Sequence, residues 1–564
     1  MKHSLDYIFR PRSIAVIGAS KRKGSFGREI LHNILSAEFN GKVFPVSLTT
    51  PVIHSIKAYS TVLDVPDAVD LAVLIVPKEH VKKVVQQCGE KGVKGLIIIS
   101  AGFSEVGSEG KILEAEILDV VREYNMRMMG PNCFGVVNTD PEVNLNANFG
   151  KTFPNIGNVG FITQSGAMGE IIMSHAKKLG IGFSIMASIG NKADISSNDI
   201  LEYFKNDPKT DVILMYLENF GNPRNFTRIA RDVSLVKPIV AVKSGRTRLG
   251  AKAAVSHTGA LAGLDVGVDA LFEQTGIMRV DTVEELFDVA AALSIQPVPD
   301  GNKVVVVTNA GGPGVLATDA LVNSGMEMPD LAPETVKELR KFSSADASFS
   351  NPMDMVAGAG AKEYKLTLEV IKEDDNFDII LPIFVPPVTC DQLEVAEHIR
   401  AALSDTKKTV YTCFMGAGES TVGIDHLKDH DIPVFIYPEA IAKTAATIYA
   451  YRKWLNRPKG KVRMFKVDSS RVKGIVEKTV KGKEGTIVGD EALEILAAYG
   501  IQVAGYRYAK SAEDAVTIAN EISYPVVMKI ATPAILHKTE AKGVIVDLRS
   551  DAEVEKAFSE LKER

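Results

Sequence analysis

The stretch Ser13-Ile-Ala-Val-Ile-Gly-Ala-Ser-Lys-Arg-Lys-Gly-Ser-Phe-Gly27 decides the fold of the first part of this chain. A short run of mostly β-branched residues leads into a turn that contains glycine, and the residues after the turn are predicted to form a helix. Such a turn directs helix N–H groups and the positive end of the helix dipole at an anion. The stretch therefore predicts a strand, a phosphate-binding turn and a helix.

The same alternation of short apolar strands with amphipathic helices continues along the chain, and it is typical of parallel α/β sheets. Further strands are predicted at residues 72–76, 95–100, 159–164, 211–217, 238–243, 303–308, 379–383 and 433–437. Near the end, a helix at 491–500 precedes strands at 524–530 and 543–548. The fold class is therefore α/β, with an α+β segment at the end.

Five segments follow from these patterns. Residues 1–130 resemble a Rossmann-type domain, and 131–297 and 298–455 are two further α/β domains. Each of these two begins with a strand that enters a glycine-rich turn, which indicates a distant structural repeat. Residues 456–485 are basic and polar and are predicted to be a solvated linker. Residues 486–564 form the last domain.

Composition excludes several classes of protein. The 564 residues are 46% hydrophobic and 24% charged, with a net charge of −5, so a globular protein is expected and nucleic acid is not an expected partner. No apolar run is long enough to span a membrane and the N-terminus lacks a signal sequence, so we expect a cytoplasmic location. The cysteines, Cys88, Cys133, Cys390 and Cys413, form no CxxC pair, which argues against disulfides or a thiolate zinc site.

The ligand of the first turn is a nucleotide in our interpretation. The strand at 42–48 does not end in the acidic residue that would bind the ribose of NAD. Coenzyme A fits better, with Lys21, Arg22 and Lys23 available for its phosphates. The alternative is a Rossmann fold whose lysines are merely solvated and bind no nucleotide.

His257 lies among glycines, alanines and hydroxyl residues in the segment 250–263. A neutral imidazole is a nucleophile near neutral pH, and nearby glycines allow backbone N–H groups to approach a phosphoryl group. His257 is therefore a candidate phosphoryl carrier. The alternative is a chemically idle histidine in a tight loop.

Two glycine-rich turns and one carboxylate complete the candidate site. Ser165, Gly166 and Ala167, together with Gly311 and Gly312, begin two predicted helices whose N-termini could bind one phosphate dianion. Glycines at such turns also occur simply to allow close packing. Glu218 follows a predicted strand, where its carboxylate could accept the second imidazole N–H of His257. A surface carboxylate without a role is the alternative.

These motifs resemble, in order, those of the nucleoside-diphosphate-forming acyl-CoA synthetases, which include ADP-forming acetyl-CoA synthetase and are related to succinyl-CoA synthetase. The resemblance covers nearly the whole chain. Its most specific pieces are residues 13–20, 130–135, 163–169, 188–194 and 256–263.

The resemblance implies a CoA-binding domain, two flavodoxin-like ligase domains and the first lobe of an ATP-grasp domain. Residues expected to contact coenzyme A are Gly18, Ser20, Lys23, Gly24 and Asn132. His537, in the segment 536–540, resembles a second phosphohistidine that would relay the phosphoryl group to ADP. Lys529 is expected to bind nucleotide phosphate, and Mg²⁺ is expected at the nucleotide site through ligands that the sequence does not identify.

The implied reaction is reversible: a short carboxylic acid, CoA and ATP give acyl-CoA, ADP and phosphate through an acyl phosphate and phosphohistidine. Acetate, propionate, 3-hydroxypropionate, 4-hydroxybutyrate and succinate all remain candidate acids, and ADP is not distinguished from GDP. Only the first ATP-grasp lobe is recognised, so a truncated copy or a partner chain supplying the second lobe is expected; a homo-oligomer is also expected. The alternatives are a non-catalytic acyl-CoA-binding or regulatory subunit and an NAD-dependent Rossmann oxidoreductase.

Overall fold

Residues 13–27 form the predicted strand, turn and helix in the computed structural model of this chain. Strand β1 (Ser13–Ile17) is buried throughout, and helix α2 (Phe26–Ser36) follows the turn. The structure describes residues 3–247, 249–250, 265–388, 390–415, 421–458, 465–481, 489–531 and 538–563. His257 and His537 lie outside these described residues, so their roles stay predictions.

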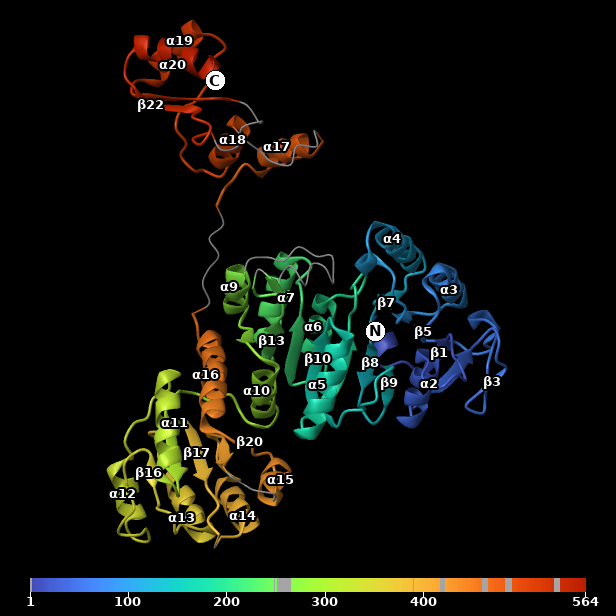
Figure 1. Cartoon of the computed structure of the whole chain (residues 1–564), viewed down its shortest axis with the longest axis vertical. Helices are drawn as coiled ribbons and strands as arrows, with labels where there is room; N and C mark the ends of the chain where they lie inside the picture. The colour runs from blue at the N-terminus through green and yellow to red at the C-terminus, as the bar shows by residue number, and fades with distance from the viewer. Residues whose placement is uncertain are drawn as a thin grey trace. The chain divides into compact units, whose positions relative to one another are not determined.

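A parallel sheet forms around β1 in the strand order β2-β1-β5-β6-β7 (Figure 1). Its other strands are β2 (Lys42–Val46), β5 (Leu71–Leu74), β6 (Gly95–Ile98) and β7 (Arg127–Met129). The associated helices are α1 (Asp6–Phe9), α3 (Lys78–Lys91) and α4 (Ser108–Glu123), and β3 (Val52–Ile53) pairs with β4 (Ile56–Lys57). Because the strand order reverses between β1 and β5, their carboxyl ends flank the point where open α/β sheets bind ligands.

A second sheet has the order β14-β13-β12-β10-β11-β8-β9. The strands that pair in parallel are β10 (Ile156–Thr163), β11 (Phe183–Ser188), β12 (Val212–Leu217), β13 (Ile239–Lys243) and β14 (Met278–Val280). Strands β8 (Gly135–Asn138) and β9 (Leu145–Asn148) add an antiparallel edge. Its helices are α5 (Gly166–Lys178), α6 (Ser197–Asn206), α7 (Pro223–Ser234), α9 (Asp265–Thr275) and α10 (Val283–Ile295).

A third, parallel sheet follows in the order β16-β15-β17-β19-β20, with β18 paired to β17. Its strands are β15 (Val304–Thr308), β16 (Met353–Asp354), β17 (Ile379–Phe384), β18 (Thr409–Val410), β19 (Thr412–Phe414) and β20 (Val434–Phe435). Its helices are α11 (Gly311–Asn323), α12 (Pro333–Leu339), α13 (Ala361–Ile371), α14 (Gln392–Leu403), α15 (Val422–Lys428) and α16 (Pro438–Leu455). The central strands are buried on both faces, as expected for parallel sheets covered by helices.

Residues Met1–Arg457 form one compact unit, and Pro458–Arg564 form a second one. In the second unit, β21 (Val526–Lys529) pairs antiparallel with β22 (Val544–Leu548). Its helices are α17 (Ser469–Lys481), α18 (Asp490–Ala498), α19 (Ala512–Ile522) and α20 (Asp551–Glu563).

Within the predicted linker at 456–485, residues 469–481 form helix α17. Val472, Ile475 and Val476 recur at helical spacing within the basic run. The charged residues pair with α18, where Arg471 lies 3.1 Å from Glu494 and Lys478 lies 2.8 Å from Glu491. The charged residues of 469–481 therefore lie on an amphipathic helix.

The predicted α/β class is confirmed, and the predicted strands agree with the observed ones to within a few residues. Among the described residues, no helix is long and apolar enough to cross a membrane. Of the cysteines, Cys88, Cys133 and Cys413 are buried and Cys390 is half-buried, each as a free thiol.

Candidate functional site

Gly18 shapes the turn between β1 and α2. Its φ is +97°, and a Cβ atom added there would lie 2.2 Å from the carbonyl oxygen of Ile75, which follows β5. A Cβ atom on Gly27 would lie 2.1 Å from the oxygen of Gly18. Both glycines are therefore required for the chain to pass this closely between the two strand ends.

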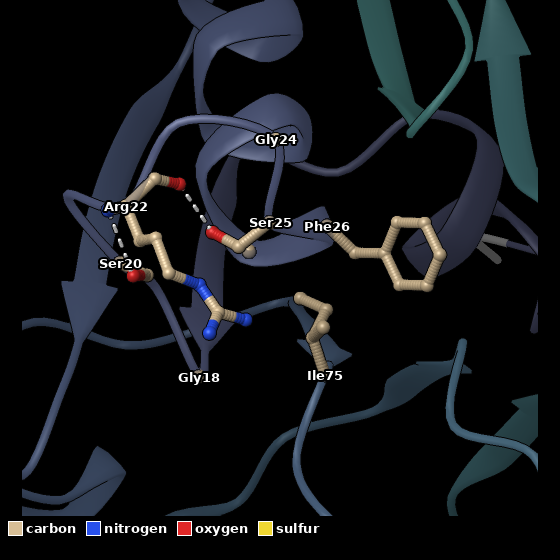
Figure 2. Close-up of a pocket in the computed structure, with 8 residues that line it drawn as sticks. Gly18, Ser20, Arg22, Gly24, Ser25, Phe26 and Ile75 are labelled. Atoms are coloured by element: carbon tan, nitrogen blue, oxygen red, sulfur yellow. Dashed lines mark hydrogen bonds between the residues drawn. The ribbon is translucent and has the colours of Figure 1, made fainter.

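The turn encloses a cavity of about 480 Å³ at the switch point of the sheet. Its lining residues are Gly18, Ser20, Arg22, Gly24, Ser25, Phe26, Gly27 and Ile75. Figure 2 shows the Arg22 side chain on the side of Gly18 and Ile75, with the Phe26 ring pointing away from it. The predicted Gly18, Ser20 and Gly24 thus lie together, whereas Lys23 is exposed and Arg22 lines the cavity instead.

The N-terminus of α2 is open toward this cavity. Ser25, at the N-cap position, makes no capping hydrogen bond, because its hydroxyl donates to the carbonyl oxygen of Arg22 at 2.7 Å. The Ser20 hydroxyl accepts from the N–H of Arg22 at 3.1 Å, which closes the turn on itself. An uncapped helix start with a nearby guanidinium is suited to an anionic group.

Asn132 lies after β7, at the same edge of the sheet but not in this cavity lining. Its N–H donates to the oxygen of Ser100, which follows β6, at 3.0 Å. Its side-chain amide donates to Asn191 Oδ1 at 3.3 Å. Asn132 therefore joins the first sheet to the loop after β11 of the second sheet.

The turn after β10 is built by Thr163, Gln164 and Ser165. The Thr163 hydroxyl donates to the oxygen of Ser165 at 2.8 Å and accepts from its N–H at 3.1 Å. Ser165 caps α5 by accepting from the N–H of Met168 at 3.4 Å. Gly166 begins α5, where an added Cβ would lie 3.0 Å from Phe134 Cβ, and Ala167 follows it.

The turn after β15 repeats this geometry. The Thr308 hydroxyl donates to the oxygen of Ala310 and accepts from its N–H, both at 3.0 Å. The Asn309 amide exchanges hydrogen bonds with the backbone of Val385, after β17, at 2.9 and 3.0 Å. Gly311 and Gly312 then begin α11. The two turns belong to different sheets, so their convergence on one phosphate stays a prediction.

Glu218 follows β12, and Gln164 holds its backbone. Gln164 Oε1 accepts from the N–H groups of Glu218 and Asn219, the second at 2.9 Å, and its Nε2 donates to Asn219 O at 2.7 Å. The predicted Ser165, Gly166 and Glu218 thus meet at the carboxyl edge of one sheet.

Two lysines at this edge were missed from the sequence. Lys192 Nζ donates to Asn219 O at 2.9 Å and to Asn219 Oδ1. Burial lowers the pKa of Lys192 to about 8, against the attraction of Glu218. Lys243 ends β13 and is 8% exposed; burial also lowers its pKa, although Asp265 and Glu218 act in the opposite direction. A lysine that ends a buried strand is the signal that could have indicated this cluster.

Lys529, at the end of β21, lines a separate cavity of about 620 Å³ in the second unit. Lys538, Thr539 and Glu540, from the segment that contains His537, share this lining. The predicted nucleotide residue therefore lies beside the described part of that segment. Across the residues that the structure describes, no group of three acidic, histidine or cysteine side chains is arranged to hold a metal ion.

Family models match four successive parts of the chain. They are described as a CoA binding domain at residues 12–139, a succinyl-CoA ligase like flavodoxin domain at 156–293, a ligase-CoA domain at 304–460 and an ATP-grasp domain at 478–564.

Curated and solved proteins match over most of the chain. A 4-hydroxybutyrate–CoA ligase (ADP-forming) of Nitrosopumilus maritimus is 40% identical over 98% of this chain and 79% of its own length. An acetate–CoA ligase (ADP-forming) I of Archaeoglobus fulgidus is 38% identical over 99% of this chain and 79% of its own. An acetyl-coenzyme A synthetase 1 of Ca. Korarchaeum cryptofilum, in complex with phosphate and ADP, superposes with a TM-score of 0.77 at 38% identity, covering 81% of this chain and 99% of that one.

Proposed function

This chain belongs to the family of ADP-forming acyl-CoA ligases, and we propose that it interconverts a short carboxylic acid, coenzyme A and ATP with acyl-CoA, ADP and phosphate. The predicted family and the class of acid–thiol ligase are confirmed by full-length relatives at about 40% identity. These similarities support neither the oxidoreductase nor the non-catalytic subunit.

Coenzyme A is proposed to bind at the carboxyl edge of the first sheet. Its phosphates would meet the open N-terminus of α2, with Gly18, Ser20 and Gly24 allowing the backbone to approach them. Arg22 supplies a guanidinium beside the cavity, and Lys23 adds positive charge outside it. Asn132 would contact the reactive end of the cofactor, since it faces the second sheet through Asn191.

The carboxyl edge of the second sheet is proposed to carry the phosphoryl chemistry. Phosphate attacks the acyl-CoA carbonyl and the CoA thiolate leaves, which gives acyl phosphate. A His257 nitrogen then attacks phosphorus and the carboxylate leaves, so that the imidazole carries the phosphoryl group. Glu218 would hold the other imidazole N–H, and Ser165, Gly166 and Ala167, with Gly311 and Gly312, would bind the phosphoryl oxygens. The observation that carries this proposal is the clamping of the Glu218 turn beside the start of α5 by Gln164 and Lys192.

The ATP-dependent half of the reaction is proposed to use the second unit. His537 would pass the phosphoryl group to ADP, with Lys529 on the nucleotide phosphates and Mg²⁺ bound there with them. The cavity shared by Lys529 and Lys538 supports this assignment. An acetate–CoA ligase (ADP-forming) I of Pyrococcus furiosus has separate alpha and beta subunits, and its beta subunit matches 16% of this chain over 38% of its own length. A partner chain that supplies the second ATP-grasp lobe is therefore proposed, while a homo-oligomer and a cytoplasmic location stay predictions.

The acid is proposed to be short, because the two curated relatives at about 40% identity described above are named for 4-hydroxybutyrate and acetate. Phosphate-dependent release of CoA from acyl-CoA, followed with a thiol reagent, tests the proposal without any nucleotide. Acetyl-, propionyl-, 3-hydroxypropionyl-, 4-hydroxybutyryl- and succinyl-CoA form the panel. Release that requires phosphate supports the ligase, and the preferred thioester identifies the acid. Absence of release from every thioester, with CoA still bound, would contradict the ligase and favour the binding subunit; NADH binding seen by absorbance titration would favour the oxidoreductase.

A further inference from the structure

Lys192 occupies a loop that bends sharply after β11. Its φ is +52°, a conformation that residues other than glycine, asparagine and aspartate seldom adopt, and its N–H donates to Ile189 O at 2.9 Å. From this loop the ammonium group donates twice to Asn219, at the backbone oxygen and at Oδ1. The turn that carries Glu218 is thus held by Gln164 from β10 and by Lys192 from β11.

The charges around Lys192 come from the neighbouring strand ends. Glu218, after β12, attracts the ammonium group, and Lys243, at the end of β13, repels it. Lys243 in turn faces Asp265 and Arg279. Burial is the largest influence on the pKa of Lys192, which it lowers to about 8. A half-buried ammonium group is costly unless it is hydrogen-bonded, so its two bonds to Asn219 are the interactions that keep it here.

The same loop is anchored on the CoA-binding domain. The Asn191 amide donates to Glu105 Oε2 at 2.6 Å and to Glu114 Oε2 at 2.9 Å, and the Asn191 N–H donates to Pro131 O at 2.9 Å. Three residues after Asn191, Asp194 accepts from Arg127 at 2.9 Å. Two adjacent residues of one loop therefore bind different parts of the protein: Asn191 contacts the CoA-binding domain, and Lys192 contacts the turn that carries Glu218.

We propose that Lys192 is a positioning residue for Glu218: from a loop anchored on the CoA-binding domain, the Lys192 ammonium group holds the turn of Glu218 and Asn219 in place for phosphoryl transfer. The inference rests on the proposed function, and it assigns to Lys192 a role in the histidine step rather than in formation of acyl phosphate. Loss of the ammonium group therefore slows phosphorylation of the protein by acyl phosphate more than it slows phosphate-dependent CoA release.

The test compares Lys192→Met, Lys192→Arg and Lys237→Met with the unmodified chain. Lys237 is a matched control, because it is a half-buried lysine of the same domain that donates to two backbone oxygens, of Phe204 and Asp207, both at 2.6 Å, and whose pKa is also lowered by burial. The initial rate of labelling by ³²P-acetyl phosphate and the rate of CoA release from acetyl-CoA are both measured, with circular dichroism as the check on folding.

Lys192→Met is expected to reduce the labelling rate about tenfold more than the rate of CoA release, the size expected for loss of hydrogen bonds from a charged group. Lys192→Arg recovers part of the lost labelling rate, and Lys237→Met changes neither the labelling rate nor the rate of CoA release. In the unmodified chain labelling slows above about pH 8, where Lys192 loses its proton; Lys192→Arg moves this decline to higher pH, because a guanidinium stays charged.

Equal labelling by Lys192→Met and the unmodified chain would overturn the inference and leave the proposed function intact. Equal loss of labelling and CoA release in Lys192→Met would also overturn it, since a positioning role acts on one step. If the unmodified chain releases CoA but takes no label, the proposed phosphohistidine step itself fails and this inference fails with it.

Discussion

The side-chain amide of Gln164 binds both backbone groups of Asn219. Gln164 Oε1 accepts from the Asn219 N–H at 2.9 Å, and Gln164 Nε2 donates to the Asn219 carbonyl oxygen at 2.7 Å. One amide thereby fixes the end of β12 against the end of β10. Asn309 makes the same pair of bonds to Val385 in the third sheet. The paired bonds explain why an amide residue precedes both glycine-rich turns.

Gln164→Leu is expected to lower stability by about 1–3 kcal/mol, because the N–H groups of Glu218 and Asn219 lose their acceptor. It also slows labelling by acyl phosphate, since Glu218 is no longer held in place. Asn309→Leu, which removes the equivalent pair of bonds in the third sheet, should cost similar stability, measured by urea unfolding. If Gln164→Leu changes neither the stability nor the rate of labelling, the hydrogen bonds of Gln164 to Glu218 and Asn219 do not position Glu218.

Gly18→Ala is expected to weaken CoA binding at least tenfold, because the methyl group would meet Ile75 O at 2.2 Å in a left-handed conformation and such strain costs about 1–3 kcal/mol. Gly24→Ala provides the comparison: Gly24 also has a positive φ, but no atom lies within 4 Å of its added Cβ. Calorimetric titration with CoA should therefore show the tightest binding for the unmodified chain, weaker binding for Gly24→Ala and the weakest for Gly18→Ala. Equal affinities of the three proteins for CoA would mean that CoA does not bind at the turn between β1 and α2.

Arg127→Met is expected to lower the melting temperature by removing bonds to Asp194 and Asp199, each 2.9 Å long. Burial alone would raise the pKa of Asp199, but hydrogen bonds from Ser196 and Arg127 lower it overall. A carboxyl whose folded pKa is lowered stabilises the protein above its ordinary pKa of about 3.9 and loses that contribution as the pH falls through the folded value. The difference in melting temperature should therefore be full near neutral pH and shrink below about pH 4; a difference independent of pH would contradict this account.

Removal of Mg²⁺ with a chelator is expected to leave labelling by acetyl phosphate unchanged and to abolish the labelling by ATP that the chain shows together with the proposed partner chain. Lys243 and the N-terminus of α5 supply positive charge at the carboxyl edge of the second sheet, whereas Mg²⁺ is expected only with the nucleotide. Loss of both labels on chelation would show that a metal ion also serves the acyl phosphate step.

The sequence predicts the sheets well because their strands are short β-branched runs bounded by turns, as at β1, β12 and β15. Helix α17 was missed because its lysines conceal a helical repeat of valine and isoleucine. The pairing of Lys478 with Glu491 and of Arg471 with Glu494 depends on the folded contact with α18.

Gly18 and Glu218 could be recognised locally, one by its turn and the other by its place after a strand. Lys192 could not be recognised in this way, and Lys243, which ends a strand, could not be linked to Glu218, because their proximity to Glu218 depends on three strand ends meeting in the sheet. Arg22 rather than Lys23 lines the cavity. The sequence did not indicate this, because the direction of each side chain in the turn depends on the backbone conformation of the turn.

Labelling of the unmodified chain, His257→Ala and His537→Ala with ³²P-acetyl phosphate, and separately with γ-³²P-ATP, tests the central claim most directly. The account predicts an acid-labile, base-stable label from acetyl phosphate that His257→Ala lacks and His537→Ala keeps. Label from ATP should require His537 and the proposed partner chain. Label from acetyl phosphate that persists in His257→Ala, or its absence from the unmodified chain with every acyl phosphate, would contradict the assignment of His257 as the phosphoryl carrier.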